Sequence, residues 1–144
     1  MYQKLVVGVD FSEKSERAIA AAVRLVKSIA GAELVLVHAV ALATQAEVAD
    51  DGEGNRLATL EQRLKTQASA LAAAQSINVD YGVVEGPSAA RALIEYVTRW
   101  GGHLVVVGTQ QHSTLNRILI GSVAQTVVEL SPVPVMVVGP SVTG

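Results

Sequence analysis

Five short apolar runs, rich in β-branched side chains, recur along the chain and predict five buried strands. Within each run the hydrophobic residues are continuous rather than alternating, which indicates that both faces of the strand are covered. Strands of this kind are typical of a parallel sheet with helices on each side. The expected strands span residues 5–9, 34–40, 79–84, 104–107 and 135–138.

Between these runs, apolar residues recur three and four positions apart and predict amphipathic helices. The periods lie within residues 19–30, 57–72 and 90–100, and a last helix is expected to open at Gly121-Ser122. Gly31 and Gly101 follow two of the periods as helix stops, and Pro87 is expected in the first turn of the third helix. Strands and helices therefore alternate along the chain, which predicts a three-layer α/β/α sandwich with right-handed crossovers.

Residues 41–55 interrupt this alternation. The segment is long and contains the polar sequence Asp50-Asp51-Gly52-Glu53-Gly54, so we expect a surface loop, with a lid over a binding site as the alternative. The chain shows no internal repeat and no linker composition, and residues 1–144 are therefore expected to form a single domain.

The composition excludes several functional classes. The 144 residues carry 11 Lys and Arg against 13 Asp and Glu, a net charge of −2, which gives no electrostatic reason to expect nucleic acid or an anionic membrane as a partner. The chain has no cysteine, which excludes disulfides, thiolate metal sites and cysteine nucleophiles. No apolar run approaches the ~20 residues of a membrane span, and the N-terminus leads into a strand without a signal peptide, so a soluble cytoplasmic protein is expected.

Familiar catalytic and cofactor motifs are missing as well. There is no Gly-x4-Gly-Lys-Ser/Thr loop, no Gly-x-Gly-x-x-Gly fingerprint and no Gly-x-Ser-x-Gly elbow. The three histidines do not combine with carboxylates at metal-ligand spacing; His38 and His103 fall in strand runs and are expected to be structural, whereas His112 lies in a candidate phosphate loop. A receiver domain is excluded because the third strand ends in Glu85-Gly86 and the fifth in Gly139-Pro140, without the required Asp and Lys.

Asp10 follows the first expected strand. Ligands of an open parallel sheet bind at the carboxyl ends of its strands, where the strand order reverses, so this position suits a binding residue. The Asp10 carboxylate could accept hydrogen bonds from a ribose or base. It could also cap the following helix, as could the Ser12 hydroxyl, and the two roles of Asp10 do not exclude each other.

Gly121-Ser122 opens the last expected helix. Ser122 and Gln125 make a Ser-x-x-Gln capping box, which by itself explains the serine. The same helix N-terminus would also stabilise a phosphate. Gly121, together with Gly108-Thr109 after the fourth strand, would let a phosphate approach the backbone closely.

Six segments, taken in order and spacing, carry a family resemblance over nearly the whole chain: residues 7–12 (VGVDFS), 36–40 (LVHAV), 84–87 (VEGP), 105–109 (VVVGT), 119–123 (LIGSV) and 133–138 (VPVMVV). The sequence resembles the universal stress protein family. The resemblance implies an adenine nucleotide alpha hydrolase-like fold, whose five-stranded parallel sheet has the order 3-2-1-4-5. That order places the ends of the first and fourth strands side by side, so that Asp10 and Gly108 face one crevice.

The nucleotide-binding branch of this family carries Gly-x2-Gly-x9-Gly-Ser/Thr, whose glycines and hydroxyl wrap ribose and phosphates. This chain matches the frame without insertion, except that Gln111 stands where the second glycine belongs. A glutamine there would cost about 1 kcal/mol if the backbone were left-handed, and its side chain could either block a phosphate or hydrogen-bond to it. Arg117 and His112 could add positive charge nearby. The resemblance implies that adenine and ribose contact Val9, Asp10 and Ala39, and that ribose and phosphates contact Gly108, Thr109, Gln110, Gly121, Ser122 and Val123, with Gln111 at the departing position.

The resemblance implies an ATP-binding regulatory protein of the stress response, with or without Mg²⁺. Hydrolysis or self-phosphorylation is expected to be slow at most, because the sequence suggests neither a carboxylate nor a lysine beside the phosphate loop. Two alternatives stay open: a dimeric interaction module whose site is vestigial because of Gln111, and a binder of AMP or a cyclic nucleotide.

A homodimer through the last strand is also implied by the resemblance. The apolar strand that runs from Pro134 to Val138 supports the homodimer independently, since an edge strand of this kind is normally paired or protected. Coverage of the edge by residues 140–144 is the alternative.

Overall fold

The computed structural model of the chain describes residues 2–42, 53–112, 117–119 and 121–140, with the backbone alone for 53–55, 110–112 and 117–119. The elements follow in the order β1 (Lys4–Gly8), α1 (Glu13–Ser28), β2 (Glu33–Ala41), α3 (Glu53–Gln75), β3 (Val79–Gly86), α4 (Ala89–Trp100), β4 (Leu104–Gly108), β5 (Gln110–His112), β6 (Arg117–Leu119), α5 (Ser122–Leu130) and β7 (Val135–Val138).

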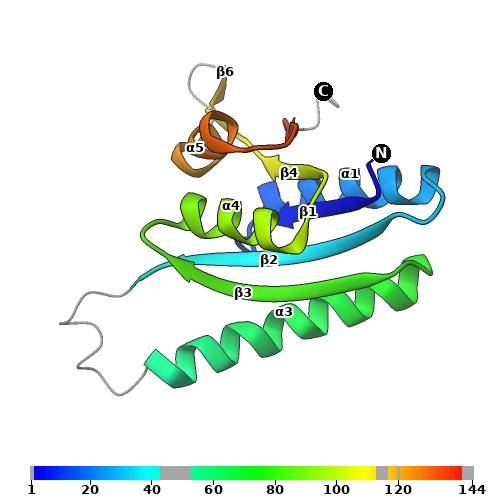
Figure 1. The fold of residues 1–144 in the computed structure, drawn as a ribbon, viewed down its shortest axis with the longest axis horizontal. Coiled ribbons are helices and arrows are strands. Elements are labelled where there is room, and N and C mark those ends of the chain that lie inside the picture. Colours follow the sequence, from blue (N-terminus) through cyan, green and yellow to red (C-terminus); the bar gives the residue numbers. More distant parts are fainter. Residues whose placement is uncertain (1, 43–52, 113–116, 120, 141–144) are drawn as a thin grey trace.

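Five strands form one sheet in the order β3-β2-β1-β4-β7, and every neighbouring pair is parallel. Counted among themselves, these strands have the order 3-2-1-4-5, which confirms the predicted fold. The first strand lies in the centre, with β2 and β3 on one side of it and β4 and β7 on the other (Figure 1). The strand order therefore reverses between β1 and β4.

Alternate residues of the central strand enter two separate cores. Leu5 and Val7 of β1 pack with α1 and α3, whereas Val6 packs with α4 and α5. All three side chains are fully buried. In Figure 1 the long α3 runs beside β3, while α5 lies toward the opposite edge of the sheet. Burial on both faces is the physical reason why the hydrophobic runs are continuous.

The start of α4 differs from the expectation. Ser88 is the N-cap of this helix, and its Oγ accepts the Arg91 N–H at 3.1 Å, so Pro87 precedes the helix rather than lying in its first turn. At the other end, Gly101 has a φ of 74°, the left-handed conformation that suits a glycine stop.

The segment between β2 and α3 is shorter than the expected loop of residues 41–55. Strand β2 continues to Ala41, and α3 already begins at Glu53. Residues 43–52 lie outside the described residues, and with them the choice between a loop and a lid.

A short antiparallel hairpin of β5 and β6 follows β4, which the hydrophobic pattern does not predict. Each strand has three residues, too few for a period of two to be recognised. In the register of the hairpin, Gln111 pairs with Ile118. The hairpin carries the chain from the end of β4 toward the start of α5.

Candidate functional site

A cavity of about 300 Å³ opens at the carboxyl ends of β1, β2 and β4, where the strand order reverses. Open α/β sheets bind their ligands at this edge. The N-terminal parts of α1, α4 and α5 complete its walls. Of the residues predicted for the site, those lining the cavity are Val9, Asp10, Ala39, Gly108, Gly121, Ser122 and Val123.

Thr109 does not line this cavity, contrary to the sequence expectation. It is only 1% exposed. Its hydroxyl donates to the Val138 carbonyl oxygen at 3.3 Å, and its backbone N–H donates to the same oxygen at 2.9 Å. Arg17 of α1 in turn donates to the Thr109 carbonyl oxygen at 2.9 Å. Thr109 therefore ties the end of β4 to β7 and α1, and its hydroxyl is engaged away from the cavity.

Gln110 and Gln111 lie in β5, and their side chains fall outside the described residues. A strand backbone has negative φ, which any residue adopts without strain. The backbone penalty considered for Gln111 therefore does not arise, because its place in β5 requires no left-handed conformation. His112 and Arg117 pair in the same hairpin, with side chains likewise outside the described part.

Asp10 follows β1 and is held by donors from two residues. Its Oδ1 accepts the Ser12 backbone N–H at 3.0 Å and also the Ser12 hydroxyl, and its Oδ2 lies 3.2 Å from Lys14 Nζ. Partial burial acts to raise the pKa of Asp10, but the bonds from Ser12 and Lys14 together outweigh it and hold the pKa below its usual value. Asp10 is thus ionised at neutral pH.

Ser12 is the N-cap residue of α1, but its side chain does not cap the helix. The hydroxyl donates to Asp10 instead of accepting a helix N–H, so the expected Ser12 cap is wrong. Asp10, by contrast, does accept a backbone N–H at this helix start, that of Ser12.

Phe11 fixes the turn between β1 and α1. Its φ is 63°, a left-handed conformation that is unusual for an aromatic residue. The centroid of the Phe11 ring lies 4.9 Å from that of the His38 ring. The guanidinium carbon of Arg63, in α3, lies 4.1 Å from the centroid of the same Phe11 ring. His38 Nδ1 is 2.7 Å from the Val9 carbonyl oxygen, so His38 has the structural role that the sequence predicts. The stack anchors the end of β1 to β2 and α3.

His103 is structural as well, as predicted. Its Nδ1 accepts the backbone N–H groups of Gln3 and Lys4, each at 3.1 Å. Within the described ranges, no group of His, Asp and Glu residues could hold a metal ion. In the same part of the chain, no helix is long and apolar enough to cross a membrane.

Gly108 and Gly121 both line the cavity but for different reasons. A Cβ at position 108 would lie 2.2 Å from the Lys14 carbonyl oxygen, so α1 can approach the end of β4 only because residue 108 has no side chain. Gly121 has a φ of −64°, and among the described residues a Cβ there would meet nothing within 4 Å. Packing therefore requires Gly108, whereas neither packing nor backbone conformation requires a glycine at 121.

The N-terminus of α5 opens on the cavity, with Gly121 as N-cap and Ser122 as first helical residue. The backbone bond from the Gln125 N–H to the Gly121 carbonyl oxygen, at 2.9 Å, begins the helix. No side chain in the described part of the chain caps this end, and the Gln125 amide donates to Glu129 at 3.4 Å, so the expected Ser122/Gln125 capping box is wrong. The N–H groups of residues 122–124 precede that first bond and, with the helix dipole, favour an anion.

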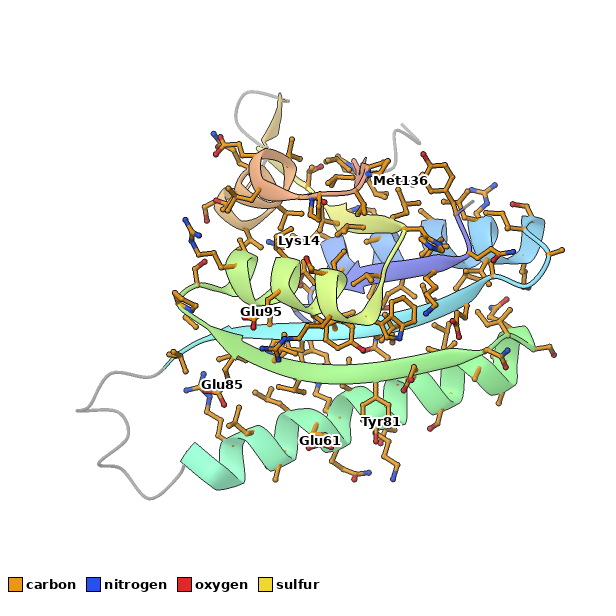
Figure 2. The ribbon with its side chains drawn as sticks, viewed as in Figure 1. Lys14, Glu61, Tyr81, Glu85, Glu95 and Met136 are labelled. Carbon is orange, nitrogen blue, oxygen red and sulfur yellow. The ribbon has the colours of Figure 1, made fainter. Side chains whose placement is uncertain are left out.

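Lys14 and Ser15 also line the cavity, although the sequence analysis does not select them. Ser15 is buried, and its hydroxyl donates to the Ser12 carbonyl oxygen at 3.0 Å. Lys14 brings a cation to the site, where the sequence analysis expects no lysine; in the view of Figure 2 it lies between the ribbons of α4 and α5. The four-residue spacing from Asp10 gives no reliable signal, because Asp10 precedes α1 and the rule for side chains four apart holds within a helix.

Comparison with known proteins agrees with this architecture. The model of the universal stress protein family matches residues 1–139. Universal stress protein MJ0531 of Methanocaldococcus jannaschii is 27% identical over 143 residues, covering 96% of this chain and 82% of the relative. Among solved structures, hypothetical protein MJ0577 has a TM-score of 0.77 at 23% identity and covers 98% of both chains. A universal stress protein in complex with cAMP has a TM-score of 0.70 at 28% identity, covering 97% of this chain and 99% of the other. The chain therefore belongs to the universal stress protein family.

Proposed function

We propose that this chain binds an adenine nucleotide, with ATP as the expected ligand, and serves as a cytoplasmic regulatory protein of the stress response. The observation that carries the proposal is that one cavity brings together the Asp10 carboxylate, Gly121 and the N-terminus of α5, which no side chain of the described residues caps. A carboxylate suits the hydroxyls of a ribose, and a helix N-terminus suits a phosphate. A nucleotide carries both groups on one molecule.

The remaining walls suit a purine ring. Val37 and Ala39 of β2 and Leu93 of α4 supply apolar lining of the cavity. In this proposal adenine lies near Val9 and Ala39, the ribose hydroxyls bond to Asp10, and the phosphates extend toward α5. Gly108 lets the end of β4 form part of the floor.

A cyclic nucleotide is the second candidate. The observation in its favour is the solved relative, 28% identical, that was crystallised with cAMP. A cyclic monophosphate bears one negative charge and no terminal phosphate, so it would use less of the α5 N-terminus than ATP. Comparing ATP, AMP and cAMP directly therefore tells the candidates apart.

Fast catalysis is not part of the proposal. Among the described residues that line the cavity, Asp10 supplies the carboxylate, and its pKa is held below the usual value by Ser12 and Lys14, despite the opposing effect of burial. A general base works best when its pKa lies near the working pH, so Asp10 is a weak base at neutral pH. Any ATP hydrolysis is expected to be slow, and turnover above ~1 per second, the low end for ordinary enzymes, would contradict this expectation.

The proposal includes a homodimer formed through the last strand. β7 is an edge of the sheet, and its Val137 is 37% exposed. Val128 and Leu130 of the neighbouring α5 are exposed as well. An apolar edge strand beside apolar helix residues is a surface that a second copy could cover. The alternative function is a dimeric interaction module that binds no nucleotide. It would use the same apolar surface to form the dimer.

Calorimetric titration with ATP, AMP and cAMP in the presence of Mg²⁺ tests the function. The proposal expects micromolar binding of at least one nucleotide by the parent protein. Asp10→Ala should weaken binding by removing the ribose acceptor, and Gly121→Val should block the phosphate end without disturbing packing. Asp80→Ala serves as the matched control, because Asp80 is an exposed aspartate near the start of β3, away from the carboxyl ends of the strands.

The possible results separate the functions clearly. The proposal is supported if Asp10→Ala and Gly121→Val lose nucleotide binding while Asp80→Ala keeps it. Absence of heat for every nucleotide up to millimolar concentration would leave the interaction module as the better description. A Gln111→Gly variant that then gains affinity would identify Gln111 as the cause.

A further inference from the structure

Lys14 places an ammonium group in the cavity described above. Its side chain is 28% exposed, and its Nζ lies 3.2 Å from the Asp10 Oδ2. Among the described residues that line the cavity, Lys14 is the cation and Asp10 the anion. The two side chains form an i,i+4 pair at the start of α1, which would ordinarily be taken as a local helix contact.

The ion pair holds Lys14 only weakly. A pair of this exposure contributes little net free energy, because water solvates both charges and screens their attraction. Asp10 does not depend on the pair, since its other oxygen already accepts the backbone N–H and the hydroxyl of Ser12. The Lys14 ammonium can therefore move away from Asp10 while the carboxylate keeps its hydrogen bonds from Ser12.

The base of the Lys14 side chain is, in contrast, firmly placed. Its carbonyl oxygen and its Cβ pack so close to Gly108 that a Cβ on the glycine would lie 2.2 Å and 3.1 Å from them. Lys14 is thus fixed against the end of β4, with a flexible four-carbon stem reaching into the cavity. The same lining includes Gly121 and Ser122 at the N-terminus of α5.

We propose that Lys14 anchors the phosphates of the bound nucleotide, moving from Asp10 to a phosphate oxygen and leaving Asp10 to the ribose. This inference rests on the proposed function and extends it to ligand preference. Because Lys14 and the α5 N-terminus line the same cavity, a phosphate bound there would interact with both the helix dipole and the Lys14 ammonium. Ligands that carry phosphate gain from Lys14, whereas adenosine does not.

A purely structural role for Lys14 makes a different prediction. If the lysine only positions Asp10, its removal weakens adenosine, AMP and ATP by the same factor. The test is therefore a calorimetric comparison of these three ligands in the parent, Lys14→Met and Lys14→Arg proteins. Methionine keeps most of the stem without the charge, and arginine restores the charge. Lys27→Met is the matched control, because Lys27 lies in the last turn of the same helix and bonds to Gln75 at 2.6 Å.

We expect Lys14→Met to lose about tenfold or more in ATP affinity, the size of a charged hydrogen bond, with AMP reduced and adenosine changed by less than about twofold. Lys14→Arg should retain most of the ATP affinity, and Lys27→Met should match the parent. The parent should also lose ATP affinity more steeply with added salt than Lys14→Met does.

Two results would overturn the inference while the proposed function survives: ATP affinity in Lys14→Met equal to that in Lys27→Met, or equal losses for adenosine and ATP. Failure of the parent to bind any of the three ligands would overturn both. A thermal melt of each variant guards against misfolding. If Lys14→Met does not fold, two other measurements decide whether Lys14 binds the phosphates. They are the ligand affinities of Lys14→Gln, and the salt dependence of binding to the parent compared between ATP and adenosine.

Discussion

Replacing Gly108 with alanine should destabilise the protein through a backbone clash. The added Cβ would lie 2.2 Å from the Lys14 carbonyl oxygen and 2.7 Å from its carbonyl carbon. An ordinary contact between carbon and oxygen is about 3.3 Å, so the first turn of α1 or the end of β4 must move by roughly 1 Å. Because neither partner is the tip of a flexible side chain, we expect the upper part of the usual overpacking range, about 3 kcal/mol.

The matched variant is Gly121→Ala. Position 121 has an ordinary φ of −64°, and no atom of the described residues lies within 4 Å of a Cβ placed there, so alanine fits. Replacing glycine by alanine at an N-cap costs about 0.5–1 kcal/mol, and the reduced entropy of the unfolded chain offsets a similar amount. We therefore expect its free energy of unfolding to stay within about 0.5 kcal/mol of the parent.

Thermal denaturation followed by circular dichroism, at one protein concentration, measures both variants. A loss of about 3 kcal/mol corresponds to a melting temperature lower by roughly 6–12 °C in a domain of this size. Gly121→Ala should melt within about 2 °C of the parent. If Gly108→Ala melts with the parent, or if the two variants shift together, then the close approach of α1 to β4 is not what requires glycine at 108, and the reasoning is refuted.

Three further predictions concern Asp10, β7 and α4. The folded pKa of Asp10 lies below the ordinary 3.8, so its interactions stabilise the protein fully above that pH, and this stabilisation is lost as the pH falls through the lowered pKa. Asp10→Asn should therefore be less stable than the parent at pH 7, and the difference in free energy of unfolding should narrow below about pH 4 in an acid denaturation series. A difference that stays constant with pH would contradict this. Val137→Lys should dissociate the proposed dimer in sedimentation experiments, because paired edge strands would bring like charges together; an unchanged sedimentation coefficient places the interface elsewhere. Ser88→Ala should lower stability to urea by about 1 kcal/mol through loss of the Arg91 N–H acceptor, and Ser88→Asp should restore it.

Local patterns were sufficient to predict the sheet and most helices. Buried strands such as β1 and β4 have apolar side chains on both faces, and this burial leaves a continuous hydrophobic run in the sequence. The β5–β6 hairpin was missed because three-residue strands carry no readable period. The expected caps at Ser12 and Ser122 are wrong for two different reasons. The Ser12 hydroxyl has a better partner in Asp10, whereas Ser122 is already the first helical residue behind the N-cap Gly121.

The candidate site divides in the same way. Asp10, Gly108 and Gly121 could be selected from the sequence, since each follows a strand or opens a helix. Thr109 was selected with them, but its hydroxyl bonds to the Val138 carbonyl oxygen, a partner that no local pattern reveals. Lys14 is not predicted from the sequence as a site residue, because it belongs to the site only through the cavity that it lines.

The sequence by itself determined the alternation of elements, the two-sided burial of the strands and the family, because each is expressed in residues that are neighbours along the chain. Only the tertiary structure decided that Gly108 serves packing while Gly121 leaves open space, and that Lys14 shares a cavity with both. These relations join residues about a hundred positions apart, through the parallel pairing of β1 with β4 and the packing of α1 against the end of β4. Contacts of that kind depend on how whole elements pack, and no periodicity within a single segment encodes them.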